Sequence, residues 1–269
     1  MPDYNETQIV ARLHEATIMA RRAGELTLEY FQKGVAIEHK EDGSPVTVAD
    51  REAEQLLRRE IARLFPNDEI IGEEFADAAG TTGYRWILDP IDGTKSFISG
   101  VPLYGTLVGV EFGGDAVVGV VFIPGLDEMV YAATGQGAWH IVNGAAPTRA
   151  KVNENIQDLS DGLFVTTQLD TFAARGAEDV YVALEKKAYI TRTWGDCYGY
   201  VLVATGRAAV MVDPILNVWD AAAVKPIIVE SGGAFVDWQG ASTIRSGDAI
   251  GTTPGLLNQV LKITKTAEK

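Results

Sequence analysis

The sequence has few of the residues on which several common protein classes depend. Among its 269 residues are one cysteine, three histidines and 23 Lys+Arg against 37 Asp+Glu, a formal net charge of −14 at pH 7. The single cysteine, Cys197, cannot form an internal disulfide, so we expect a reducing compartment such as the cytoplasm. The shortage of basic residues argues against a nucleic-acid partner, because affinity for DNA and RNA rests largely on Lys and Arg contacts to phosphate.

Long apolar runs and nucleotide-binding motifs are missing as well. No run approaches the ~20 apolar residues that cross a bilayer, and the acidic N-terminus lacks the pattern of a signal peptide, so we expect a soluble protein with no membrane partner. Neither a G-x-x-x-x-G-K-[S/T] loop nor a G-x-G-x-x-G fingerprint occurs. His14, His39 and His140 have no zinc-site or serine-hydrolase spacing, so nucleophilic Ser or Cys catalysis has little support.

The apolar fraction of 46% supports a sizeable core, and the apolar spacing predicts an α/β protein in two parts. In the first part, residues 1–146, helices over Asn5–Gln32 and Thr47–Phe65 precede an antiparallel sheet. The expected strands of that sheet are Glu69–Gly72, Arg85–Asp89, Thr106–Phe112, Ala116–Ile123, Met129–Ala133 and Ala138–Val142.

The second part, residues 147–269, alternates strands with helices, and we expect it to form a separate α/β domain. Its expected strands are Leu163–Thr166, Tyr189–Thr193 and Ala208–Val212. Its expected helices are Cys197–Thr205, Ala221–Ser231 and Leu256–Thr264.

The most informative segment is Tyr84–Phe97, YRWILDPIDGTKSF. An apolar strand delivers Asp89, and a turn through the following proline could bring Asp92 back to the same point. Two carboxylates plus waters and substrate phosphate form a typical Mg²⁺ site. Gly93 allows close backbone approach, and Thr94 could open a helix whose N–H groups hold phosphate oxygens. Because Asp, Pro and Gly are also turn residues, the segment alone leaves a plain turn open.

Four more acidic residues occupy strand ends or helix starts. Glu73 and Glu74 follow a short strand, where a solvated sheet edge is the alternative explanation. Asp50 lies near the start of the second helix, where it could interact with the helix dipole. Asp220 precedes an alanine-rich helix, where it could be a simple N-cap. Taken together they indicate a shared ligand site, because α/β proteins tend to build such sites at these positions.

These segments together resemble the inositol monophosphatase family, in order and spacing, over nearly the whole chain. The matching motifs are Gly72–Glu74 (GEE), Asp89–Thr94 (DPIDGT), Trp219–Ala223 (WDAAA) and Glu230–Gly233 (ESGG). The resemblance implies an αβαβα layered sandwich of the inositol monophosphatase/fructose-1,6-bisphosphatase type. It also implies a Mg²⁺-dependent phosphomonoesterase that forms a homodimer.

The resemblance further implies a role for each matched residue. The implied ligands of one Mg²⁺ are Glu73, Asp89 and the carbonyl of Ile91, and those of a second are Asp89, Asp92 and Asp220. A third, weaker ion would touch Glu73, and Mn²⁺ is an alternative to Mg²⁺. Asp50 and the Thr94 hydroxyl would orient and deprotonate the attacking water, with Glu73 counted among the catalytic residues. Gly93 and Thr94 would contact the phosphate.

Within the family, three later segments look like the histidinol-phosphatase branch, which implies a role in histidine biosynthesis. They are Thr193–Tyr200 (TWGDCYGY), Thr205–Ala208 (TGRA) and Met211–Pro214 (MVDP). Histidinol phosphate carries an ammonium and an imidazole. A cation offsets the desolvation cost of a buried carboxylate, whereas an uncharged polyol does not.

We therefore expect Asp196 and Asp213 to pair with the cationic groups of the substrate. Asn217 and Tyr198 would add hydrogen bonds or stacking, and Arg192 would contact phosphate or remain a surface charge. The alternative is that Asp196 caps the following helix while Asp213 contacts a sugar hydroxyl, as in inositol-specific members.

Two other functions remain open. One is an inositol monophosphatase or a broad sugar phosphatase of the same family. The other is a catalytically inactive relative that acts as a binding or regulatory module. The second is disfavoured because every carboxylate that the mechanism uses is present, together with Thr94.

Overall fold

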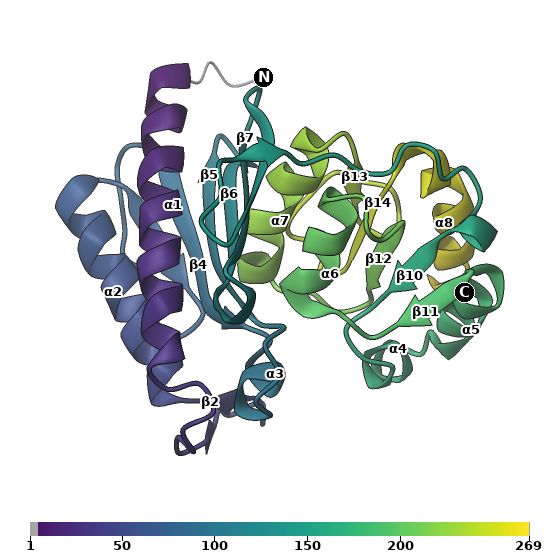
Figure 1. The fold of residues 1–269 in the computed structure, drawn as a ribbon, viewed down its shortest axis with the longest axis horizontal. Coiled ribbons are helices and arrows are strands. Elements are labelled where there is room, and N and C mark those ends of the chain that lie inside the picture. Colours follow the sequence, from purple (N-terminus) through teal and green to yellow (C-terminus); the bar gives the residue numbers. More distant parts are fainter. Residues whose placement is uncertain (1–4, 269) are drawn as a thin grey trace.

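The computed structural model describes residues 5–268, which fold into five alternating layers of helix and sheet (Figure 1). From one side to the other, these are a helix pair, a seven-stranded sheet, a second helix pair, a five-stranded sheet and an outer helical layer. The helices of the three helical layers are α1 (Glu6–Leu28) with α2 (Val48–Leu64), α6 (Asp196–Ala204) with α7 (Val218–Glu230), and α4 (Asp170–Arg175), α5 (Glu178–Lys187) and α8 (Leu257–Thr264). This is the αβαβα sandwich that the resemblance implies.

The seven-stranded sheet follows chain order, and its neighbouring strands are antiparallel except for the parallel pair β3 and β4. Its strands are β3 (Glu69–Gly72), β4 (Tyr84–Asp92), β5 (Gly105–Phe112), β6 (Asp115–Ile123), β7 (Glu128–Ala133), β8 (Gly137–Val142) and β9 (Thr148–Arg149). One face packs against α1 and α2, where Ile9, Ala16 and Leu57 lie in one buried cluster with Trp86 and Val120. This burial explains the apolar spacing from which the two helices were predicted.

Helix α7 lies against the opposite face of the same sheet, and two strand glycines set its distance. A Cβ on Gly109 would lie 2.7 Å from the Cβ of Ala222, and one on Gly119 would lie 2.0 Å from the carbonyl oxygen of Ala223. Any side chain at these positions would push the helix away from the sheet. The glycines therefore help to place the first turn of α7, which contains Asp220.

The five-stranded sheet has the strand order β11-β10-β12-β14-β13. Its strands are β10 (Leu163–Val165), β11 (Ile190–Arg192), β12 (Val210–Asp213), β13 (Ala234–Val236) and β14 (Ala249–Thr252). Strand β10 pairs in parallel with β11 and β12, so the carboxyl ends of these three strands lie at one edge of the sheet. The outer helices cover the far face through a buried cluster that includes Phe172, Leu184 and Val260.

The structure differs from the sequence-based elements in several places. Helix α1 ends at Leu28 instead of Gln32; residues 29–32 form a turn, and the left-handed backbone of Gln32, with φ of 60°, cannot continue a helix. Helices α4 and α5 and strands β13 and β14 were not predicted. Helix α7 begins at Val218, three residues early, because Asn217 is its N-cap.

The predicted division after residue 146 stays a prediction. Strand β9 continues the first sheet past that point by pairing with β8. In addition, α6 and α7 contribute to one buried cluster that includes residues of both sheets. Among the described residues, no helix is long and apolar enough to cross a membrane.

Candidate active site

A cleft of about 530 Å³ opens where the carboxyl ends of β4 and β12 meet the first turns of α3 (Thr94–Ile98), α6 and α7. It collects most of the residues predicted from the sequence to form a site. Those that line it are Glu73, Asp89, Ile91, Asp92, Gly93, Thr94, Asp196, Asp213, Asn217 and Asp220. Residues as far apart in the sequence as Glu73 and Asp220 therefore share one cavity, as the analysis of strand ends and helix starts predicts.

A β-bulge in β4 brings Asp89 and Asp92 to the same side of the strand. Asp89 pairs with Leu107 of β5 and Asp92 with Gly105, so β4 has one more residue than its partner over this stretch. The extra residue shifts the alternation of side chains by one position. The predicted convergence of the carboxylates is confirmed, but a bulge within the strand produces it instead of a turn.

Asp89, Asp92 and Asp220 form the tightest acidic cluster among the described residues. Each offers an oxygen within 4.8 Å of those of the other two. Asp92 accepts a hydrogen bond from the backbone N–H of Cys197, and Asp220 accepts one of 2.8 Å from the N–H of Asn217. Asp220 is thus the third residue of its helix and closes a capping box, and is not the N-cap itself.

The electrostatics of this cluster fit a divalent cation. Burial first, and then the neighbouring carboxylates, raise the pKa values of Asp89 and Asp92 well above their usual range. Burial raises the pKa of Asp220 to about 7. Three carboxylates this close repel one another unless protons or a cation intervene, and hard oxygen donors are those that Mg²⁺ prefers. The donor set present therefore fits a hard divalent cation such as Mg²⁺.

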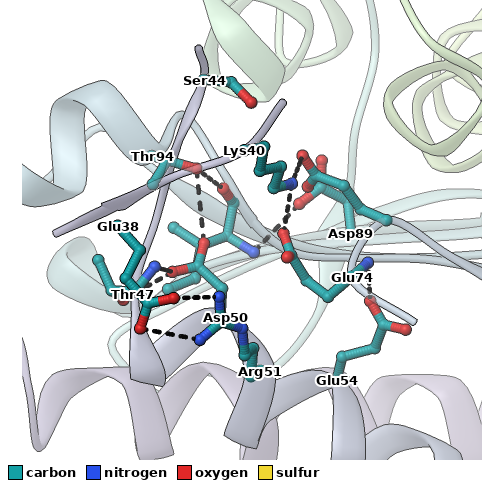
Figure 2. A network of polar contacts seen from close by, with 12 residues as sticks. Glu38, Lys40, Ser44, Thr47, Asp50, Arg51, Glu54, Glu74, Asp89 and Thr94 are labelled. Atoms are coloured by element: carbon teal, nitrogen blue, oxygen red, sulfur yellow. Dashed lines mark hydrogen bonds and ion pairs between the residues drawn. The ribbon is translucent and has the colours of Figure 1, made fainter. Parts of the chain in front are cut away.

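The proposed water-activating pair also meets in the structure (Figure 2). The Thr94 hydroxyl donates to Asp50 Oδ1 at 3.5 Å and to the Ile91 carbonyl at 3.1 Å. Asp50 is fully buried, and its Oδ2 accepts from the N–H and the hydroxyl of Thr47, at 2.8 and 2.6 Å. Its pKa is raised because burial disfavours the charged form. The capping box of α2 thus holds Asp50 in place beneath Thr94.

Lys40 was not predicted as a site residue, yet its ammonium lies 2.7 Å from both Glu73 Oε1 and Glu74 Oε1 (Figure 2). It lies in the hairpin of β1 (Glu38–His39) and β2 (Pro45–Val46). Burial lowers the pKa of Lys40, but its bonds to the two glutamates outweigh this and raise it overall. Glu73 lines the same cleft, and after burial its charge contributes to the raised pKa of Asp89, but it lies outside the group of three aspartates and already contacts one cation. No spacing in the sequence relates Lys40 to these glutamates.

The structure does not bring two of the predicted substrate residues to the cleft. Tyr198 is two positions from Asp196 on α6, so it points to the far side of the helix, where the Arg207 guanidinium lies 5.8 Å from its ring. Arg192 is exposed on β11 and donates to the carbonyl of Thr191 at 2.7 Å. Asp196 and Asn217 line the cavity as predicted.

Asp213 lines the cleft but is only 2% exposed. Its Oδ1 accepts from the Thr167 hydroxyl and its Oδ2 from the Tyr200 hydroxyl, each at 2.9 Å. Burial raises its pKa to about 7. Thr167 was missed in the sequence, although it lies two residues beyond the end of β10, and the carboxyl ends of parallel strands are a recognisable position for site residues.

Comparison with known proteins decides the family. Residues 11–268 match the inositol monophosphatase family. The chain belongs to this family. It is 42% identical over 239 residues to a histidinol-phosphatase of Chlorobaculum parvum, covering 88% of this chain and 90% of that protein.

Two further similarities agree with this membership. The chain is 36% identical to a histidinol-phosphatase of Mycobacterium tuberculosis, over 91% of this chain and 95% of the other. Its fold matches a solved inositol monophosphatase of Thermotoga maritima with a TM-score of 0.84 and 28% identity, over 96% and 98% of the two chains. The protein is thus a phosphoric monoester hydrolase whose sequence is most like the histidinol-phosphatase branch.

Proposed function

We propose that this enzyme hydrolyses L-histidinol phosphate to L-histidinol and phosphate with the help of Mg²⁺. The observation that carries the proposal is the position of Asp196. Its carboxylate lines the cleft, and a Cβ built on Gly93 would lie 2.9 Å from its Oδ2. An acidic group beside the phosphate-cleaving centre suits a substrate whose leaving alcohol is positively charged. The names of the two curated relatives support the same choice.

The carboxylate cluster would hold the Mg²⁺, two or three ions in all, with Mn²⁺ as a substitute. The proposed ligands are Glu73, Asp89, the Ile91 carbonyl, Asp92 and Asp220. When bound, Mg²⁺ polarises the phosphoryl oxygens and makes a water molecule more acidic. The three aspartates suit this role because their oxygens lie within 4.8 Å of one another and repel unless protons or a cation intervene, whereas Glu73 is paired with Lys40 in this structure.

The chain's own residues would then handle the proton and the phosphate. Asp50 would accept the proton of the attacking water through the Thr94 hydroxyl, which lies 3.5 Å from Asp50 Oδ1 and 3.1 Å from the Ile91 carbonyl oxygen. The raised pKa of Asp50 makes it a better proton acceptor than an ordinary exposed aspartate. Gly93 and Thr94 would contact the phosphate, and water would attack in line without a phosphoenzyme.

The alternative substrate is an inositol or sugar phosphate, which the fold and the Thermotoga maritima relative support. With an uncharged polyol, the charge of Lys95, which also lines the cleft, would be the compensation for the half-buried Asp196 carboxylate, whereas a cationic substrate would add to it. We also propose that the enzyme acts in the cytoplasm as a homodimer, as the family resemblance implies.

A phosphate-release assay with Mg²⁺ tests the substrate. It compares histidinol phosphate, inositol 1-phosphate and fructose 1,6-bisphosphate on the wild type, Asp196→Ala and the isosteric Asp196→Asn. We expect the wild type to prefer histidinol phosphate and both variants to lose that preference. A wild-type preference for inositol 1-phosphate that survives Asp196→Ala would overturn the substrate assignment and leave the metal centre intact.

A further inference from the structure

The backbone of Asp196 is unusual for the first residue of a helix. Its φ is 49°, in the left-handed region that non-glycine residues seldom adopt. Such a conformation persists only where surrounding contacts hold it. The contact here is a hydrogen bond of 2.9 Å from the Asp196 N–H to the Thr167 hydroxyl oxygen. Asp196 is therefore held in place by a residue from another element, the segment after β10.

The Thr167 hydroxyl cannot reorient freely, because groups behind it determine where its one proton points. That proton is donated to Asp213 Oδ1 at 2.9 Å, which leaves a lone pair directed at the Asp196 N–H. The other carboxylate oxygen of Asp213 accepts from the Tyr200 hydroxyl at 2.9 Å, and Tyr200 is 1% exposed. Asp213 itself is also buried. The result is a continuous series of hydrogen bonds from Tyr200 through Asp213 and Thr167 to the backbone of Asp196.

Close packing extends this series of hydrogen bonds to the metal cluster. A Cβ on Gly195 would lie 2.1 Å from the Cα of Thr167, so the two backbones touch. On the other side, the Asp196 carboxylate lies against Gly93, and the N–H of Cys197 donates to Asp92. The start of α6 is thus fixed between Thr167 and the end of β4. A shift of Thr167 would move the Asp196 carboxylate relative to the phosphate-binding side of the cleft.

We propose that Thr167, supported by Asp213 and Tyr200, is a positioning residue that gives the cleft its selectivity for a positively charged substrate by holding the Asp196 carboxylate in place. The proposal rests on the proposed function, since it takes Asp196 as the partner of the substrate's cation. It assigns Asp213 a supporting role in place of the direct substrate contact expected from the sequence, because Asp213 is only 2% exposed and both of its oxygens accept hydrogen bonds from buried partners or from Thr167.

The test is a pair of nearly isosteric variants, Thr167→Val and Thr167→Ser. Valine keeps the shape but leaves the Asp196 N–H without an acceptor, whereas serine keeps the hydroxyl. We measure kcat and KM for histidinol phosphate and for inositol 1-phosphate at saturating Mg²⁺. Thr167→Val should lower kcat/KM for histidinol phosphate about 10- to 100-fold, because a loss of this size is expected when a charge-assisted contact is removed. The kcat/KM for inositol 1-phosphate should change less than about threefold. Thr167→Ser should restore the wild-type ratio.

A second variant and a control separate positioning from stability. Tyr200→Phe removes only the hydroxyl behind Asp213 and should lower the same substrate ratio to a smaller extent. Thr252→Val removes another fully buried threonine hydroxyl, which donates to the Ala209 carbonyl at 3.1 Å away from the cleft. It should leave the substrate ratio unchanged.

The outcomes distinguish this proposal from the proposed function. If the wild type prefers histidinol phosphate and both Thr167→Val and Tyr200→Phe keep that preference, the positioning role is wrong and the substrate assignment stands. Equal losses for both substrates would likewise overturn the positioning role. If the wild type itself does not prefer histidinol phosphate, the proposed function is wrong, and this proposal is overturned with it.

Discussion

Removing divalent ions should destabilise the protein, and more so at higher pH. The reason is the mutual repulsion of Asp89, Asp92 and Asp220, whose oxygens lie within 4.8 Å of one another. At that distance, and with an effective dielectric constant of about 20, each ionised pair costs about 3.5 kcal/mol. Three such pairs would cost about 10 kcal/mol, comparable to the whole stability of an ordinary domain. The metal-free cluster must therefore hold protons.

The sign of the pH dependence follows from the raised pKa values. Asp220 has a pKa of about 7 in the folded chain, against an ordinary value of 3.8. Its protonated form stabilises the folded state below about pH 4, and this contribution is lost as pH rises towards 7. Mg²⁺ should restore the loss, since it replaces the protons. At 100 times its dissociation constant a ligand adds about 2.7 kcal/mol, which raises the Tm of a chain of this size by about 5–10 °C.

The assay is thermal unfolding of chelator-treated protein at pH 5 and pH 8, with and without MgCl₂. We expect a Mg²⁺-induced rise in Tm that is larger at pH 8 and is strongly reduced in Asp220→Asn. The control is Asp158→Asn, which changes an exposed aspartate outside the cleft and should respond as the wild type does. An equal Mg²⁺ effect in Asp220→Asn and the wild type would refute the assignment of the cluster.

Three further predictions address the water-activating pair, the core and the buried hydrogen bonds behind Thr167. Asp50→Asn should reduce phosphate release by about two to four orders of magnitude, as expected for loss of a general base. The rise in Tm with Mg²⁺ should remain. A loss of activity of less than tenfold would rule out Asp50 as the base. Arg12→Ala should lower the free energy of unfolding by about 3–5 kcal/mol in urea denaturation, because Arg12 is 3% exposed and makes two bonds of 2.9 Å to buried Asp68. The double variant Arg12→Met/Asp68→Asn should recover part of that loss, and no recovery would show that the charge is not the cause. Because the pKa of Asp213 is about 7, its ionisation lowers the stability of the wild type between about pH 4 and 7. We therefore compare the Tm of the wild type with that of Asp213→Asn, both with Mg²⁺, and expect the wild-type value to fall relative to that of the variant between pH 5 and pH 8. A relative rise would contradict the sign.

Most of the elements that carry the carboxylate cluster could be predicted because they have local signals, whereas the layer order came from the family resemblance. The sequence shows short apolar runs that are followed by Glu73 or end in Asp89. It also shows an alanine-rich helical segment that is preceded by Asp220. The family motifs then related these distant segments to one another. The convergence of Asp89 and Asp92 was also predictable, although the bulge that causes it was not, because a bulge depends on pairing with β5.

The substrate side of the cleft was predicted less well. Tyr198 was chosen from its place in a motif and Arg192 as a possible phosphate contact, but the side of α6 or β11 on which a side chain lies depends on how that element packs. Lys40 and Thr167 were missed because their partners, Glu73 and Asp196, are 33 and 29 residues away in the chain. These contacts follow from tertiary packing, so the sequence could indicate the position of Thr167 near a strand end but not its partner.

The metal centre itself can be tested most directly by anomalous diffraction from crystals grown or soaked with Mn²⁺. We predict strong anomalous peaks within coordination distance of the carboxylate oxygens of Asp89, Asp92 and Asp220, with a further peak near Glu73 once Lys40 has moved aside. Crystals of an active enzyme with no peak between these three aspartates would contradict the account.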